Sequence, residues 1–421
     1  MTATGPISVR LVPAGGEEVA VGTLRVARGR RNETATFAYD PAYLADPRAY
    51  PIDPNLPLRA GTFATGPDAD LFGAMADSAP DRWGQNLLRR AERNLARAES
   101  RAQRELTASD FLVGVHDEQR QGALRYAAPD GTYLAGDDLG VPRIVDLPRL
   151  LALTDRALRD PNLDTDLRDL VNAGGSLGGA RPKAAVRDHT GTLRIAKFPR
   201  IDEDEWDVEG WEKVTLDLAA AAGITVPRSE LVTVLDRHVL LLDRFDRDGE
   251  RRVGYVSAQT LLGMSGRTDE TSLAELAEAM QLDTASPDRD LGELFRRGLF
   301  GLLVSNTDNH VRNHGFLRTQ RGWALSPMFD VNPNPEPARF AMPMDPGGDD
   351  DIADAIDSAD AFRLTRQDAL AELATLVTVL DGWVQMAHRH AIPTPELKML
   401  SAAFESPRVD RARGLLATAG A

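Results

Sequence analysis

Residues 302–317 read LLVSNTDNHVRNHGFL and set a short polar patch between two apolar segments. The apolar run from Leu299 to Val304 gives way to mostly polar residues, and apolar sequence resumes at Gly315. Polar and charged groups placed between buried elements cost stability unless they meet a partner. The pattern therefore predicts a loop whose polar side chains interact with a ligand or with other polar groups.

The spacing within this loop is informative, because four residues separate Asp308 from Asn313. Phosphoryl-transfer enzymes of the protein-kinase type place a catalytic aspartate and a metal-binding asparagine at this separation. There, the aspartate accepts the proton of the attacking hydroxyl, and the asparagine amide oxygen holds Mg²⁺. The alternative is that both residues only cap a loop, since the pattern D-x-x-x-x-N is common by chance.

A second carboxylate follows at Asp330. Residues 315–318 and 323–325 predict a β-hairpin that turns at residues 320–322. A hairpin returns the chain close to where it left, so Asp330 is expected near Asn313. Two aspartates and an asparagine on adjacent loops form an oxygen set that suits Mg²⁺ carrying nucleotide phosphates.

Composition is that of an ordinary globular protein, with 421 residues, 42% hydrophobic and 27% charged, which predicts two or three domains. No apolar run approaches 18 residues and the N-terminus lacks a signal-peptide pattern, so a cytoplasmic protein is expected. The absence of cysteine excludes disulfides, thiolate metal sites and cysteine nucleophiles. A net charge of −15 argues against broad electrostatic binding of nucleic acid, though not against a local basic patch.

The N-terminal part predicts a small β-rich unit followed by an arginine-rich helix. Strands are expected over 7–12, 19–26, 34–39, 111–115 and 123–126. The helix is expected over 81–100, with Ser78 as its N-cap, Pro80 in its first turn and Asp81 at the capping-box position. Its arginines form either a solvated face or a docking surface for an acidic partner or the DNA backbone.

A glycine-rich loop at residues 174–183 follows a helix expected over 147–173. It is not a Walker A sequence, because Ala180 and Arg181 follow Gly179. Its glycines still allow backbone N–H groups to approach an anion closely. The alternative is a plain flexible loop.

The next segment favours the anion interpretation. Residues 184–187 and 193–198 predict a hairpin whose period-2 alternation puts Lys197 on the apolar face. A lysine on such a face is unusual unless an anion meets it there. Glycine-rich loop, hairpin and inward lysine follow the order in which kinases build the ATP-phosphate site. A helix expected over 208–222 carries Glu209 and Glu212, either of which could pair with Lys197 or remain a surface carboxylate.

A further hairpin, 231–235 with 239–242, leads into residues 243–247, which include Asp243 and Phe245. In kinase order this segment crosses from the small lobe to the large lobe beside adenine. From Thr271 onward the chain is expected to be mainly helical, ending with helices over 366–390 and 394–404. Residues 345–360, which are rich in aspartate, are expected to form a solvated loop.

Taken together, these ordered motifs resemble the HipA family, the kinase toxins of bacterial toxin–antitoxin pairs. The similarity runs over nearly the whole chain. The motifs are residues 77–84 (DSAPDRWG), 120–124 (RQGAL), 178–183 (GGARPK), 195–198 (IAKF), 244–247 (RFDR), 306–313 (NTDNHVRN) and 329–330 (FD). The glycine-rich stretch is variable in the family, so the resemblance does not carry over a substrate.

The resemblance implies a serine/threonine-protein kinase of α+β class, with a two-lobe kinase-like core, an N-terminal β-rich subdomain and a mainly helical C-terminal lobe. The implied parts are residues 1–145, 146–245 and 246–421. Asp308 is then the catalytic base, and Asn313 and Asp330 hold Mg²⁺. The implied nucleotide-binding residues are Ser176, Gly178, Gly179, Lys183, Lys197, Glu212, Asp243 and Phe245.

The resemblance also implies partners and regulation. Family members are usually neutralised by a small helix-turn-helix antitoxin of the HipB type, which would provide the only contact with DNA. Some phosphorylate an aminoacyl-tRNA synthetase. Ser176 matches a loop serine that is autophosphorylated in the family, which would switch the kinase off. Two other functions remain open: a kinase for a small hydroxyl compound, and a catalytically silent partner of a DNA-binding antitoxin.

Overall fold

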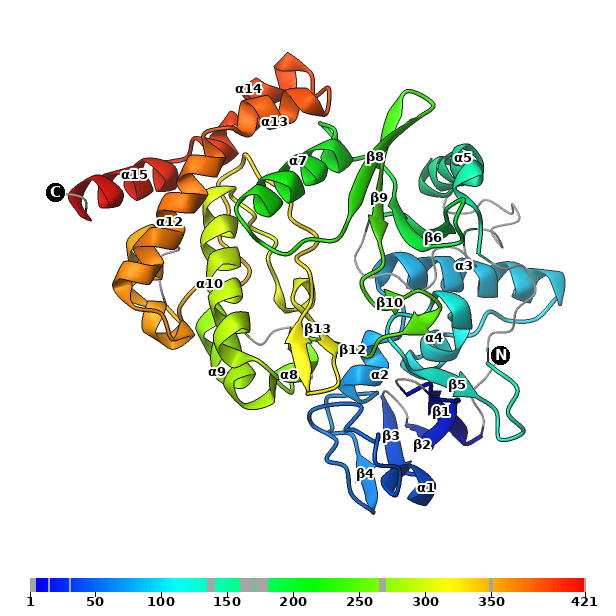
Figure 1. The fold of residues 1–421 in the computed structure, drawn as a ribbon. Helices are drawn as coiled ribbons and strands as arrows, with labels where there is room; N and C mark the ends of the chain where they lie inside the picture. Colours follow the sequence, from blue (N-terminus) through cyan, green and yellow to red (C-terminus); the bar gives the residue numbers. More distant parts are fainter. Residues whose placement is uncertain are drawn as a thin grey trace. The chain divides into compact units, whose positions relative to one another are not determined.

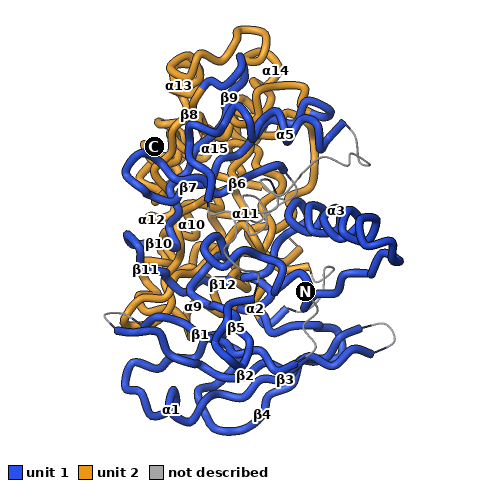
Figure 2. The backbone as a smooth tube through the Cα atoms, turned by 90° about the vertical axis from the view of Figure 1, so that its right-hand side faces the viewer, with its two compact units in different colours: residues 1–203, 233–256, 263–267 blue, residues 204–232, 257–262, 268–421 orange. Residues whose placement is uncertain are grey.

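The computed structural model describes most of the chain as two compact units (Figures 1 and 2). The described residues are 5–13, 16–29, 32–134, 141–159, 170, 181–264, 270–347 and 351–419. Unit 1 comprises residues 1–203, 233–256 and 263–267, and unit 2 comprises 204–232, 257–262 and 268–421. Most of the strands lie in unit 1 and most of the helical residues lie in unit 2, so the predicted α+β class is confirmed.

The first sheet of unit 1 has five strands in the order β4-β3-β2-β1-β5, all antiparallel. Its strands are β1 (Ile7–Leu11), β2 (Val19–Arg28), β3 (Glu33–Tyr39), β4 (Thr62–Ala64) and β5 (Arg125–Ala127). The alternation in β3 buries every second residue, including Phe37 and Tyr39, so one face of the sheet forms a core. The first three predicted strands are thus confirmed.

Two predictions in this region are wrong for local reasons. Residues 111–114 lie not in a strand but in α4 (Ala108–Gly114), which begins with a capping box between Thr107 and Asp110 and has Val115 as its C-cap. The arginine-rich helix α3 (Arg82–Ala98) begins after Asp81, not after Ser78. Ser78 instead ends the short helix α2 (Gly73–Asp77), where its hydroxyl donates to the Met75 carbonyl. The remaining short helix is α1 (Pro41–Leu44).

The second sheet has four strands in the order β6-β7-β9-β8. These are β6 (Lys183–Arg187), β7 (Leu193–Lys197), β8 (Ser229–Val234) and β9 (Arg237–Asp243), and the chain passes into unit 1 within β8. Both predicted hairpins are present, and the second turns through Leu235 and Asp236 at φ 47° and 63°, as a two-residue hairpin turn requires. Helix α5 (Leu147–Arg159) precedes the sheet, and β10 (Arg247–Asp248), β11 (Arg251–Arg252) and β12 (Tyr255–Ser257) follow it.

Unit 2 is predominantly helical, as predicted from Thr271 onward. Its helices are α7 (Val208–Ala221), α8 (Ala258–Leu261), α9 (Leu273–Asp283), α10 (Pro287–Leu303), α11 (Ile352–Asp357), α12 (Arg366–Leu380), α13 (Trp383–Arg389), α14 (Thr394–Phe404) and α15 (Pro407–Ala419). Helix α10 runs through the middle of the unit with α9 and α12 beside it (Figure 1). The predicted hairpin is present as β13 (Gly315–Arg318) and β14 (Trp323–Leu325).

The structure corrects three expectations in unit 2. The aspartate-rich segment contains α11, because Ile352 and Ile356, one turn apart, are both buried. The helix expected over 366–390 is broken after Leu380 into α12 and α13, and α15 was not predicted at all. In the described part of the chain, no single helix is long and apolar enough to cross a membrane, and only α12 with α13, bent by 48°, meet that length and composition as a pair.

Candidate active site

The polar loop begins where α10 ends in a Schellman motif. The Asn306 N–H donates to the Gly301 carbonyl at 2.8 Å, and the Ser305 N–H donates to the Leu302 carbonyl at 3.3 Å. Ser305 adopts a left-handed φ of 54°, and its hydroxyl donates to the Ala403 carbonyl at 3.1 Å. The helix end is therefore fixed by backbone and side chain, which gives the following loop a defined starting direction.

A second segment, which follows Asp330, lies along this loop. The Asn332 N–H donates to the Asn306 side-chain oxygen at 3.3 Å, and the Asn334 amide donates to the Thr307 hydroxyl at 2.9 Å. The Ala341 N–H donates to the Thr307 carbonyl at 2.9 Å. These bonds bring the segment that carries Asp330 back to the loop that carries Asp308.

Asp308, Asn313 and Asp330 are gathered in one place in unit 2. Asn313 closes the 3₁₀ turn Val311–Asn313, and its side-chain nitrogen donates to the Asp308 carbonyl at 2.8 Å. Because the nitrogen end of this amide is turned to the loop, its oxygen end is turned away and can serve as a ligand. Partial burial raises the pKa of the Asp308 carboxyl, His310 lowers it and the negative charge of Asp330 raises it. The net effect is a raised pKa for Asp308, and part of it comes from electrostatic repulsion between the Asp308 and Asp330 carboxylates.

This donor set fits a divalent cation. Two carboxylates that repel one another are stabilised when a cation lies between or beside them, and Mg²⁺ prefers oxygen ligands. The described residues contain no group of three or more histidine, cysteine, aspartate or glutamate side chains placed to hold a metal ion. A magnesium ion here would accordingly take oxygens from Asp330 and Asn313 and keep further positions for water or phosphate.

Two residues that adjoin the loop, Arg297 and His314, are buried. Arg297 of α10 is buried, forms an ion pair with Glu293 at 2.8 Å and donates to the Ser326 carbonyl at 2.7 Å. His314, directly after Asn313, is also buried, and burial lowers its pKa to about 3, with Arg297 and His310 adding to the effect. His314 is therefore neutral at physiological pH and serves packing, while Arg297 ties the end of the hairpin to α10.

In unit 1, two lysines stand directly opposite each other on β6 and β7. Lys183 pairs with Lys197 in the antiparallel register, and both are buried, with 5% and 6% of their surface exposed. Directly opposed residues place their side chains on the same face, where two like charges destabilise a sheet. An anion on this face would offset that repulsion, so the pair fits the phosphates of a nucleotide. The buried position predicted for Lys197 is confirmed.

The other predicted nucleotide residues lie in different elements of the two units. Asp243 lies at the end of β9, half-buried, in an ion pair with Arg194 at 2.8 Å. The ring of Phe245 lies 6.2 Å from that of Tyr255. Glu212 is buried on α7 in unit 2 whereas Lys197 belongs to unit 1, and their pairing stays a prediction. Ser176, Gly178 and Gly179 lie outside the described residues.

Arg244, Asp246 and Arg247 of the motif at residues 244–247 form a buried structural network. The buried Asp246 carboxylate accepts two bonds from Arg244 at 2.6 and 2.8 Å, one from Arg247 at 2.8 Å and one from the Gly122 N–H at 2.8 Å. Despite the opposing effect of burial, Arg244 and Arg247 hold the pKa of Asp246 well below its usual range. Arg244 also donates to the Gln119 carbonyl at 2.6 Å. This aspartate therefore ties residues 119–122 to residues 244–247.

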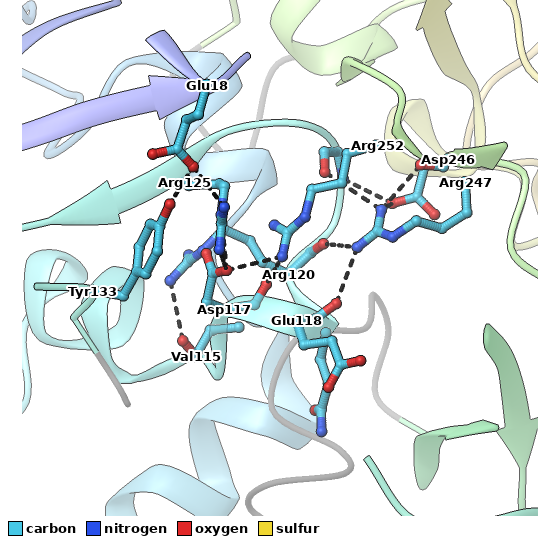
Figure 3. Close-up of polar contacts among 12 residues, drawn as sticks. Glu18, Val115, Asp117, Glu118, Arg120, Arg125, Tyr133, Asp246, Arg247 and Arg252 are labelled. Carbon is cyan, nitrogen blue, oxygen red and sulfur yellow. Dashed lines mark hydrogen bonds and ion pairs between the residues drawn. The ribbon is translucent and has the colours of Figure 1, made fainter. Parts of the chain in front are cut away.

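The network continues into the N-terminal sheet (Figure 3). Arg252 and Arg125 both donate to Asp117, at 3.0 and 2.5 Å, and Arg125 reaches Glu18 beyond β1. Arg120 is fully buried, and this burial lowers its pKa to about 10. It donates to the carbonyls of Ser78 and Val115 and covers the ring of Tyr126. We refer to Asp117, Arg120, Arg125, Arg244, Asp246, Arg247 and Arg252 as the arginine cluster.

Two arginines of the arginine-rich helix α3 make contacts within unit 1. Arg90 donates to the Ala157 carbonyl of α5 at 2.6 Å, and Arg89 lies over the ring of Phe111 at 4.8 Å. The Trp83 indole N–H donates to the Lys183 carbonyl at 3.2 Å, which joins α3 to β6. Arg97 remains exposed. The helix is thus in part a scaffold beside the lysine pair.

Sequence reasoning missed Thr215 and Asn306, which hold the backbone next to Asp330. The Thr215 hydroxyl of α7 donates to the Val331 carbonyl at 2.5 Å. Asn306 is the first residue of the motif at 306–313, and nothing in the sequence marks it as a partner of Asn332. Their spacing carried no signal, because Thr215 lies 116 positions from its partner.

The chain is similar to two proteins described as putative kinases. Y4mE of Sinorhizobium fredii is 26% identical over 311 residues, which cover 70% of this chain and 71% of that protein. A Haemophilus influenzae protein is 26% identical over 143 residues, 30% of this chain and 42% of that protein. Among solved structures, the HipA, HipB and operator DNA complex of Shewanella oneidensis matches with a TM-score of 0.69 and 16% identity, covering 97% of both chains.

Family comparison agrees with the resemblance drawn from the motifs. The model of the HipA N-terminal domain matches residues 16–109. The model of the HipA-like C-terminal domain matches residues 175–408, which is more than half of the chain and includes the polar loop. The chain belongs to the HipA family.

Proposed function

We propose that this protein is an ATP- and Mg²⁺-dependent kinase that transfers the γ-phosphate to a serine or threonine of a protein substrate. The observation that carries the proposal is the gathering of Asp308, Asn313 and Asp330 at the end of α10. The opposed pair Lys183 and Lys197 supports it, since buried like charges suit a polyanionic ligand. The description of two relatives as putative kinases agrees with it.

Each residue has a separate role in the proposed reaction. The Asp308 carboxylate accepts the proton of the substrate hydroxyl as its oxygen forms a bond to the γ-phosphorus. The bond between that phosphorus and the bridging oxygen breaks, and ADP leaves with the electron pair. The lysine pair binds and orients the phosphates, and Ser176, Gly178 and Gly179 are assigned to the same role from the family resemblance. Asp243 and Phe245 border adenine.

Asn313 and Asp330 would hold the magnesium ion, which when bound neutralises charge on the phosphates. Because phosphoryl transfer needs mostly positioning and charge stabilisation, these residues contribute by holding the nucleotide in one geometry. Autophosphorylation of Ser176 would add a charge of roughly −1.5 to −2 next to the nucleotide phosphates. We propose that this repulsion switches the kinase off.

The proposed biological role is that of a cytoplasmic toxin held by an antitoxin. The similar Shewanella oneidensis structure is a complex of HipA with HipB and operator DNA. We accordingly propose a helix-turn-helix antitoxin of the HipB type as partner, with DNA bound only through it. An aminoacyl-tRNA synthetase or another translation component is the proposed substrate class.

The test is incubation of the purified protein with γ-labelled ATP, with and without Mg²⁺, in a bacterial translation extract. Label on serine or threonine of a protein, lost in Asp308→Asn, is the expected result. Label on a small metabolite would point to a small-molecule kinase instead. No transfer by the wild-type protein to any acceptor, including itself, would leave the silent antitoxin partner as the better function. Mass spectrometry of the peptide containing Ser176 tests the switch.

A further inference from the structure

We propose that Thr215 on α7 is a positioning residue that fixes Asp330, and that the C-terminal helices α13 and α14 act on the active site through it. The inference rests on the proposed function, because it assigns Asp330 to metal binding. It concerns a residue outside the motifs, whose hydroxyl reaches the backbone immediately after Asp330.

The peptide group between Val331 and Asn332 is held from both sides. Its carbonyl accepts from the Thr215 hydroxyl at 2.5 Å, and its N–H donates to the Asn306 side chain at 3.3 Å. Thr215 comes from α7, and Asn306 comes from the loop of Asp308. One rigid peptide plane is thus bonded to the two elements that carry the rest of the proposed site in unit 2.

Asp330 needs this support because its backbone is left-handed, with φ 55°. A residue with a side chain adopts such a conformation only where its surroundings impose it, although aspartate tolerates it better than most. The two bonds to the next peptide group supply that constraint. They fix the direction in which the Asp330 side chain leaves the backbone.

The Thr215 hydroxyl could instead donate to a carbonyl of its own helix, but the distances favour the Val331 carbonyl. The carbonyls of Trp211 and Glu212 lie at 3.1 and 3.0 Å, whereas the Val331 carbonyl lies at 2.5 Å. A hydroxyl has one proton to donate, and the shortest contact is the one that leaves the helix. Thr215 is fully buried, so water cannot replace it as donor to that carbonyl.

Helix α7 is in turn anchored to the C-terminal helices of unit 2. The Trp211 indole N–H donates to Glu396 of α14 at 3.0 Å, and its ring lies 5.6 Å from Phe404 and 6.2 Å from Trp383. Trp211 precedes Thr215 by one helical turn, so both lie on one face of α7. A shift of α13 and α14 would move α7 and, through Thr215, the backbone beside Asp330.

The experiment measures metal affinity directly and turnover separately. Binding of Mn²⁺, as a paramagnetic substitute for Mg²⁺, is titrated by electron paramagnetic resonance at saturating ATP. The variants are Thr215→Val, which keeps the shape and removes the donor, and Thr215→Ser, which keeps the donor. The matched control is Thr378→Val on α12, since that exposed hydroxyl donates to the Ala374 carbonyl of its own helix.

Thr215→Val is expected to weaken Mn²⁺ binding roughly tenfold, the equivalent of one buried hydrogen bond. It should raise the Mg²⁺ concentration for half-maximal turnover by a similar factor. Thr215→Ser should stay within about threefold of wild type, and Thr378→Val should not differ from it. If Thr215 had only a structural role, Thr215→Val would lower the melting temperature without changing the Mn²⁺ affinity. Thr215→Ser would then restore the melting temperature and leave the Mn²⁺ affinity as it was.

Mn²⁺ affinity of folded Thr215→Val within about twofold of wild type would overturn the inference. If Thr215→Val lacks the wild-type unfolding transition, Thr215→Ala and Thr215→Ser replace it, because both lack the methyl group and differ only in the hydroxyl. Equal Mn²⁺ affinity of that pair would also overturn the inference. Wild-type protein that binds no Mn²⁺ with ATP would overturn the proposed function and the inference together.

Discussion

Replacement of Asp246 by asparagine should destabilise unit 1 strongly, because the carboxylate is the centre of the arginine cluster. One of its oxygens accepts from Arg244, Arg247 and Gly122, and the other accepts from Arg244. An asparagine has only one acceptor oxygen, so its NH₂ group would face a donor in either orientation. Two buried arginines would also lose their counter-charge. Breaking a buried ion pair in this way costs about 3–5 kcal/mol.

The assay is scanning calorimetry of the full chain, together with urea unfolding followed by fluorescence. Each kcal/mol shifts the melting temperature of a unit of this size by roughly 2–4 °C, so a fall of roughly 6–20 °C is expected for the transition of unit 1. Asp248→Asn is the matched control, because Asp248 lies two positions away and is exposed in an ion pair with Arg251. An exposed pair is worth about 0–1 kcal/mol, so this control should melt near wild type.

The pH dependence has a definite sign. The pKa of Asp246 is lowered in the folded state, so its contribution is fully present above the unfolded pKa and is lost as pH falls toward the folded one. The stability gap between wild type and Asp246→Asn should therefore be constant from pH 7 to pH 5. Below about pH 4 it should shrink by about 1.4 kcal/mol per pH unit. A gap under about 1 kcal/mol at pH 7 would refute the reasoning.

Three further predictions concern the proposed site and its surroundings. Asp308→Asn should abolish phosphoryl transfer while the melting temperature stays within a few degrees, since Asp308 lies in a loop and outside the hydrophobic core. Near-normal turnover would contradict its role as base. Trp83→Phe, which removes the hydrogen bond to the Lys183 carbonyl, should weaken ATP binding about two- to tenfold. Lys197→Met should reduce the ATP-induced rise in melting temperature further. If ATP raises the melting temperature of both variants as much as that of wild type, the phosphates bind elsewhere. Arg97→Glu should weaken binding of an antitoxin–operator complex at low salt and have less effect at high salt; equal binding at low salt would make this exposed residue a solvated surface charge.

The sequence alone predicted the parts of this protein that depend on local order. The hairpins around residues 188–191 and 319–322 follow from strand alternation and a turn, and both are present. The helix from Val208 ends where predicted, because Gly223 takes a left-handed φ of 78°. The sequence also predicted that Asp330 lies near the loop of Asp308, because a short hairpin returns the chain close to where it left.

Local patterns failed where two elements compete for the same residues. Ser78 and Thr107 are both plausible caps, but Ser78 ends α2 while Thr107 begins α4. The apolar run at Phe111–Val115 suits a buried strand as well as a buried helix, and periodicity in so short a run cannot separate them. The capping box of Thr107 and Asp110 favours the helix.

Only the tertiary structure decided which polar residues are structural. The motif containing Asp246 looked like part of a nucleotide site, yet its carboxylate is occupied by Arg244, Arg247 and the backbone of Gly122, which is 124 positions away. Thr215 carried no signal and turned out to hold the backbone beside Asp330. A hydrogen bond acts over about 3 Å, so its partner depends on how distant segments pack and not on their spacing along the chain. The sequence therefore indicated which residues could do chemistry, and packing determined that some of them, such as Asp246, are held in structural contacts.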